Sequence, residues 1–187
     1  MDTARRGPGH APPPLAMAVL PDVAAAGLDA LFVGTAVGDC QALPGHHHAT
    51  RGDAFWSLLE ASGLTPHLLR PDEEDLLPTY GLGVVDLLPE PGRERPPVRF
   101  DVASLTAKVE ALRPAWVVLT SKRTGEVVAR ASGQRPPGLG PAPWSLADSS
   151  VFVVPSPSPA NQRRAYDGRP RRLDWWAECA RVVRVRP

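Results

Sequence analysis

The chain has 187 residues, of which 43% are hydrophobic and 22% are charged, and its formal net charge is +1. This composition suffices for one domain with a hydrophobic core and excludes an intrinsically disordered chain, while the total charge indicates no particular partner. The two cysteines form no disulfide framework, and no apolar run reaches the roughly 20 residues that span a bilayer. We therefore expect a cytoplasmic protein without a membrane helix.

The first 20 residues are rich in proline, glycine and alanine, and we expect them to form a flexible tail. Two arginines precede an apolar stretch, but Pro21 and Asp22 interrupt that stretch, so a signal peptide is not expected. Residues 21–187 are expected to form a single domain.

Short apolar runs alternate with amphipathic segments along this domain. Strands are predicted over 29–34, 83–88, 115–120 and 150–154, and helices over 53–62, 101–112, 122–131 and 171–182. Asp53 is predicted to cap the first helix, and the proline-rich segments 90–97 and 134–143 are predicted to be loops. The alternation predicts a three-layer α/β fold, in which a short, mostly parallel four-stranded sheet is flanked by helices.

In a parallel α/β sheet the active crevice lies outside the carboxyl ends of the strands. The predicted strand ends are 34–38, 86–88, 120–122 and 155–159. The sequence therefore predicts a functional site at this edge of the sheet.

Positive charge is concentrated near the C-terminus. From Pro155 onwards, eight arginines stand against three acidic residues. Such a block on a nearly neutral chain favours a surface that faces a polyanion, and an ordinary solvated helix face is the alternative that charge alone leaves open.

Two of the predicted strand ends carry motifs of a known family. Gly34-Thr-Ala-Val-Gly-Asp-Cys, followed by His46-His-His-Ala and by Asp53-Ala-Phe-Trp, resembles the first motif of the mismatch-specific uracil/thymine-DNA glycosylases. Pro155-Ser-Pro-Ser-Pro-Ala-Asn resembles their second motif, a loop that wedges into the DNA duplex. The resemblance covers about residues 28 to 182. It implies a uracil-DNA glycosylase-like fold and a monofunctional DNA-repair hydrolase that releases uracil, or a related deaminated or modified base, from DNA.

The resemblance also implies roles for individual residues, because a glycosylase flips the base out of the stack into a snug pocket. The candidate base pocket comprises Gly34, Thr35, Ala36, Val37, Gly38, His46 and His48. The candidate DNA-binding loop, with prolines as a stiff wedge, comprises Ser156, Pro157, Ser158, Pro159, Ala160 and Asn161. The arginines expected to hold the DNA backbone are Arg163 and Arg164, with Arg169, Arg171 and Arg172.

The first motif departs from the family at three places. Ala36 stands where the family has the asparagine that orients the attacking water, and His46 stands where it has the aromatic that stacks on the base. His48 also replaces what is commonly an aromatic residue. A carboxylate can stabilise the cation-like sugar of the transition state or activate water. Asp86 is the first candidate for this role, with turn capping or an arginine pair as its alternative. Asp39 is the second candidate, with an Asx-turn as its alternative.

No cofactor is implied, and a metal site at the three consecutive histidines is not expected, since adjacent histidines cannot easily point at one ion. The expected partner is double-stranded DNA with a damaged or mismatched base, bound by a monomer. Two other hypotheses remain open at this point: a glycosylase-fold protein that only binds DNA or abasic sites, which Ala36 favours, and an unrelated small α/β enzyme.

Overall fold

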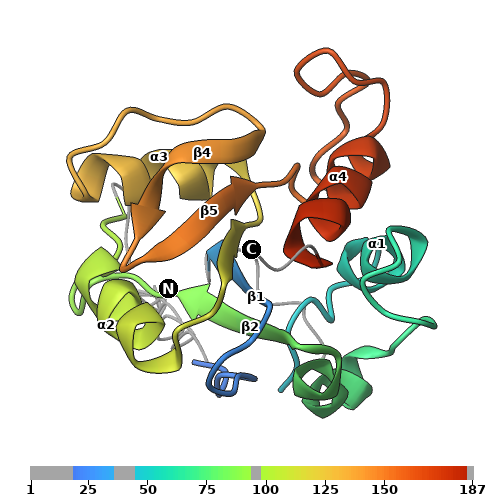
Figure 1. Ribbon diagram of the computed structural model, residues 1–187, viewed down its shortest axis with the longest axis horizontal. Coiled ribbons are helices and arrows are strands. Elements are labelled where there is room, and N and C mark those ends of the chain that lie inside the picture. The colour runs from blue at the N-terminus through green and yellow to red at the C-terminus, as the bar shows by residue number, and fades with distance from the viewer. Residues whose placement is uncertain (1–18, 36–44, 94–97, 185–187) are drawn as a thin grey trace, which may run out of the picture.

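The computed structural model describes residues 19–35, 45–93 and 98–184 (Figure 1). The strands are β1 (Ala30–Thr35), β2 (Leu82–Leu87), β3 (Trp116–Leu119), β4 (Gly140–Leu146) and β5 (Ser149–Val153). The helices are α1 (Phe55–Ala61), the 3₁₀ helix η1 (Pro71–Tyr80), α2 (Val102–Leu112), α3 (Lys122–Ala131) and α4 (Arg172–Arg184). Within the described ranges, no helix is both long and apolar enough to cross a membrane.

The strands form one sheet in the order β2-β1-β3-β5-β4. All neighbours are parallel except β4, which runs antiparallel to β5 at the edge. The predicted three-layer, mostly parallel α/β fold is thus confirmed, with five strands in place of four.

Strand β4 corrects the prediction that 134–143 is a loop throughout. Pro141 and Pro143 argue against a central strand, but an edge strand tolerates proline because one of its sides needs no hydrogen-bond donors. The pairing with β5 also shifts register between Pro141 and Ser145, which accommodates the prolines. Trp144 and Leu146 are buried and attach this strand to the core.

Alternate residues of β1 point to opposite faces of the sheet and enter two separate hydrophobic clusters. Ala30 and Phe32 pack with the cluster that includes α1, η1 and α4. Leu31 and Val33 pack with the cluster that includes α2 and α3. Figure 1 shows the same division, with α1 and α4 on one side of the sheet and α2 and α3 on the other. Helices therefore cover both faces, which leaves the strand ends as the place for a site.

Two helix starts show how local side chains set the element boundaries. Asp101 caps α2 by accepting hydrogen bonds from the hydroxyl and the amide of Ser104, and these bonds lower the pKa of Asp101 below its usual value. At α1 the predicted cap was Asp53, but the cap residue is Ala54. Asp53 nevertheless accepts the amide of Phe55 at 2.8 Å, so it still organises the start of the helix.

Candidate active site at the carboxyl ends of the strands

From β1 the chain crosses to β2 on one side, and from β3 it continues to β4 and β5 on the other side. The strand order thus reverses between β1 and β3, so a crevice is expected at the carboxyl ends of these two strands. Thr120, directly after β3, closes this edge. Its amide and its hydroxyl both donate to the carbonyl of Val33 at 3.0 Å. The hydroxyl proton of Thr120 is therefore occupied, and its oxygen offers a lone pair to the site.

Gly34 is the centre of a polar cradle formed by side chains from three segments. A Cβ atom on Gly34 would lie 3.5 Å from Oγ1 of Thr120, 3.6 Å from Oδ1 of Asp86 and 4.0 Å from Nε2 of His48. Asp86 is also the register partner of Gly34 in the β1–β2 pair. The structure thus brings together three predicted site residues, Gly34, His48 and Asp86, and adds Thr120.

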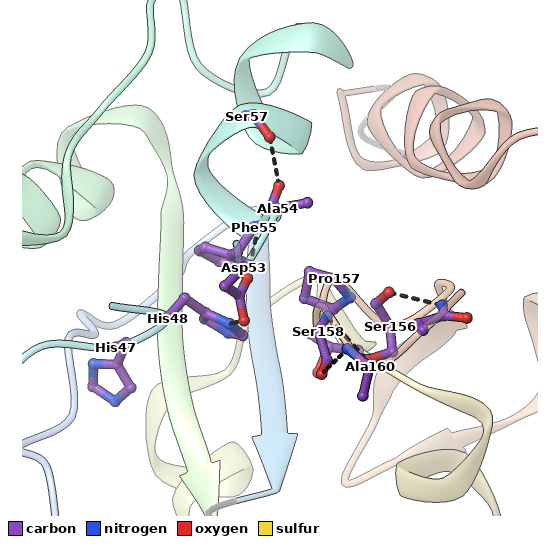
Figure 2. A network of polar contacts seen from close by, with 12 residues as sticks. His47, His48, Asp53, Ala54, Phe55, Ser57, Ser156, Pro157, Ser158 and Ala160 are labelled. Atoms are coloured by element: carbon purple, nitrogen blue, oxygen red, sulfur yellow. Dashed lines mark hydrogen bonds and ion pairs between the residues drawn. The ribbon is translucent and has the colours of Figure 1, made fainter. Parts of the chain in front are cut away.

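His48 is held rigidly beside this cradle. Its Nδ1 lies 3.1 Å from Oδ2 of Asp53, and its ring stacks on Phe55 with a centroid distance of 4.0 Å and an interplanar angle of 8°. Figure 2 shows the ring directed toward Asp53, at the start of α1. Because Asp53 and Phe55 fix the ring, its Nε2 faces the cradle.

The other two histidines bind a different carboxylate. Nδ1 of His46 lies 3.0 Å from Oε1 of Glu74, and Nδ1 of His47 lies 3.0 Å from Oε2. Glu74 comes from η1 and is buried. Of the two predicted pocket histidines, the structure therefore brings His48 to the cradle, whereas His46 pairs with Glu74. In the parts of the chain that the structure describes, no cluster of three or more His, Cys, Asp or Glu residues could hold a metal.

The second motif is an ordered loop, fixed to α1 and α4. The guanidinium of Arg172 donates to the carbonyls of Ser156 at 3.2 Å, Pro157 at 3.1 Å and Asn161 at 2.7 Å. The amide of Ala54 donates to the carbonyl of Pro157 at 3.0 Å, which joins this loop to the start of α1 (Figure 2). The loop is therefore not a plain linker: it lies against the segment that carries His48 and Asp53.

Hydrogen bonds between residues close in sequence shape the tip of the loop. The amide of Ala160 donates to Oγ of Ser158 at 3.2 Å, and the side-chain amide of Asn161 donates to the carbonyl of Ser156 at 2.9 Å. Pro157 is buried, whereas Pro159 and Ala160 are exposed. A stiff, apolar tip is thus presented to solvent.

The family model of the uracil DNA glycosylase superfamily matches residues 21–180 of the chain. The chain belongs to this superfamily. Its members are DNA glycosylases, hydrolases that act in DNA repair, and the match includes both motifs and every residue of the cradle.

In this uracil-DNA glycosylase superfamily protein, most of the C-terminal arginines are used by the protein itself. Arg171 pairs with Asp174 and Arg181 with Glu178, and these pairings lower the pKa of both acidic residues. Arg169 lies over the ring of Trp175, with its Cζ 3.9 Å from the centroid.

Two further arginines of the block, Arg163 and Arg164, are exposed. The pKa of Asp167 is lowered mainly by its partner Lys122, and the charge of Arg163 contributes to this shift. Both arginines lie just after the second-motif loop, separated from it by Gln162. That they hold DNA stays a prediction.

Some predicted residues fall outside the described part of the chain. Ala36, Val37, Gly38 and Asp39 all lie between the described ranges 19–35 and 45–93, and Thr35 is the last residue of β1. Thr120 and Glu74 were not singled out from the sequence. Thr120 belongs to a predicted strand end, which was a usable signal, whereas an acidic residue in a helical first turn usually signals only an exposed helix start.

Proposed function

We propose that the chain is a monofunctional DNA glycosylase, which hydrolyses the N-glycosidic bond of uracil or a related deaminated or modified base in mismatched duplex DNA and acts as a monomer. The observation that carries this proposal is the carboxylate of Asp86 beside Gly34, at the edge of the sheet where the second-motif loop also lies.

Asp86 has the exposure and the orientation that the chemistry requires. Its side chain retains 22% of its accessible surface, and Oδ1 faces the cradle. The carboxylate makes no hydrogen bond with the described residues, so its lone pairs are open to a sugar cation or to a water molecule. In this proposal Asp86 stabilises the developing positive charge or activates the water, in place of the asparagine that is absent at Ala36.

In this proposal the His48 ring, the tip of the second-motif loop and two arginines act in base flipping. One face of the His48 ring is covered by Phe55, and the proposed role of the other face is to stack on the flipped base. Pro159 and Ala160 fill the gap that the base leaves in the duplex. Arg163 and Arg164 bind the backbone phosphates without selecting a sequence.

The test is a single-turnover assay with excess enzyme and labelled duplexes that carry one uracil, thymine or hypoxanthine opposite guanine. We expect strand cleavage at the altered base in one or more duplexes after alkali treatment, and no cleavage without alkali. A monofunctional enzyme leaves an intact abasic strand because it has no amine nucleophile at the site.

Cleavage of none of the duplexes, together with retained binding to duplex DNA that contains an abasic site, would overturn the enzyme proposal. That outcome would favour a DNA-binding protein of the same fold, the alternative that Ala36 raises. Loss of both cleavage and binding would contradict any DNA-repair role for the site.

A further inference from the structure

His47 is a buried polar residue that the proposed mechanism leaves without a role. Its side chain is 2% exposed, and its backbone amide and its Nδ1 both contact Oε2 of Glu74, at 2.9 Å and 3.0 Å. Its Nε2 is buried and has no hydrogen-bond partner among the described residues. The carboxylate that Nε2 approaches is that of Asp86, with Oδ2 at a distance of 4.0 Å.

Glu74 fixes which ring nitrogen of His47 carries a proton. An ionised carboxylate only accepts hydrogen bonds, so the ring nitrogen that bonds to Glu74 is the protonated one. This leaves Nε2 as the variable nitrogen, directed toward Asp86. The separation of 4.0 Å is longer than a hydrogen bond, so the two groups face one another and meet only after a small movement of either side chain.

We propose that His47 is a positioning residue for Asp86: anchored by Glu74, it directs Nε2 toward Oδ2 of Asp86 from 4.0 Å and so keeps Oδ1 turned toward the cradle. This proposal rests on the proposed function, in which Oδ1 of Asp86 acts on the sugar or the water. The two oxygens of Asp86 already divide in this way, since Oδ2 lies on the His47 side and Oδ1 lies 3.6 Å from the Cβ position of Gly34.

The surrounding groups give His47 a role that its neighbours do not share. His46 contacts the other oxygen of Glu74 and is half exposed, and His48 pairs with Asp53. His47 is the histidine of this run that lies between two carboxylates from different elements, Glu74 of η1 and Asp86 of β2. Two histidines of the run thus anchor to Glu74, and one of them, His47, also approaches Asp86.

Two substitutions of His47 separate anchoring from positioning. Asparagine can reproduce the Nδ1 position and retain the contact with Glu74, but it presents nothing toward Asp86. Glutamine can reproduce the Nε2 position and present an N–H toward Asp86. We expect His47→Asn to lower the single-turnover excision rate about tenfold or more, as befits loss of an orienting partner of a general base, and His47→Gln to restore most of it.

Binding and stability serve as controls for this comparison. Both variants are expected to bind abasic-site duplex as the unmodified protein does, since the side chain of His47 is buried. His67→Asn provides a matched histidine substitution at an exposed position, and it is expected to leave the excision rate unchanged. Equal rate losses in His47→Asn and His47→Gln, or full activity in His47→Asn, would overturn the proposal.

A second measurement does not depend on activity. Nitrogen-15 NMR of the histidine rings is expected to show that Asp86→Asn changes the Nε2 signal of His47, whereas Nδ1 stays protonated and the signals of His67 do not move. An Nε2 signal that is insensitive to Asp86→Asn in an enzyme that excises bases would refute the positioning role. A responsive signal in a protein that excises no base would instead refute the proposed function and leave the His47–Asp86 pairing standing.

Discussion

At the scale of single residues, the missing side chain at Gly34 shapes the site. Thr120, Asp86 and His48 surround the position where a Cβ would lie, at distances of 3.5 to 4.0 Å that are ordinary van der Waals contacts. A methyl group therefore fits there without a clash, but it occupies the space at which the three polar atoms converge. Glycine is needed at this position for access, and not for backbone strain.

Gly34→Ala is accordingly predicted to lower the excision rate by about tenfold or more while leaving the fold intact, because the methyl group displaces the reacting atoms. The free energy of unfolding is expected to stay unchanged or to rise by up to about 1 kcal/mol, since alanine restricts the unfolded chain more than glycine does. Single-turnover assays and thermal unfolding test both parts. Gly138→Ala is the matched control, because its Cβ would also lie 3.5 Å from a side-chain oxygen. Full activity in Gly34→Ala would show that the cradle is not the reaction site.

Some of these residues could be predicted from the sequence and others could not, because only some are placed by local sequence patterns. Asp86 and Gly34 are strand-end residues, and strand ends can be predicted from local hydrophobic periodicity. Which histidine faces the cradle depends on the path of the backbone, including a left-handed φ of 51° at His48, and no local pattern encodes it. Glu74 is equally unreadable, because its burial results from how η1 packs near the histidines.

At the scale of elements, α4 organises the second-motif loop, residues 155–161, through its first residue. The planar guanidinium of Arg172 meets three carbonyls of the loop, and the indole of Trp176, one turn later, donates to the carbonyl of Pro155 at 3.1 Å. A single fork of donors can satisfy several carbonyls at once, which an ammonium group cannot do with the same geometry. Contacts within the protein thus shape the loop, and in the proposed complex with DNA this reduces the entropy cost of binding.

Arg172→Met is predicted to weaken binding to abasic-site duplex by about tenfold. The substitution removes the charge-assisted hydrogen bonds from the guanidinium to the loop carbonyls and so frees the loop. Arg171→Met is the matched control: it removes the same charge from the neighbouring residue, whose guanidinium pairs with Asp174 on the surface. Binding titrations at one fixed salt concentration compare the two. If both variants bind equally weakly, Arg172 acts through its charge alone and the loop needs no clamp.

Most elements could be predicted from the sequence, because their boundaries are set by nearby side chains. The predicted helix 122–131 coincides with α3, whose start is capped by Ser121. Strand β4 was not predicted because its two prolines are typical of a loop. Its pairing with β5 is a tertiary interaction, which the local sequence does not indicate. The 3₁₀ helix η1 was also not predicted, since its pattern is too irregular for a helical period.

At the scale of the whole molecule, the fold brings together residues from distant parts of the chain. Gly34, His48, Asp86 and Thr120 come from four separate segments, and the loop at 155–161 joins them through Ala54. The alternation of strands and helices predicted the layers, and the site that it places at the carboxyl ends of the strands stays a prediction. The alternation did not predict the order β2-β1-β3-β5-β4, which places β1 between β2 and β3, with Asp86 of β2 beside Gly34.

The account depends most on Asp86, and one substitution tests it directly. Asp86→Asn keeps the size of the side chain and removes the negative charge that the proposed chemistry needs. Single-turnover excision on the duplex that the unmodified protein cleaves, measured together with binding to abasic-site duplex, separates chemistry from recognition. The account predicts that the excision rate falls by about a hundredfold or more while binding persists. An Asp86→Asn variant that excises the base at the unmodified rate would contradict it.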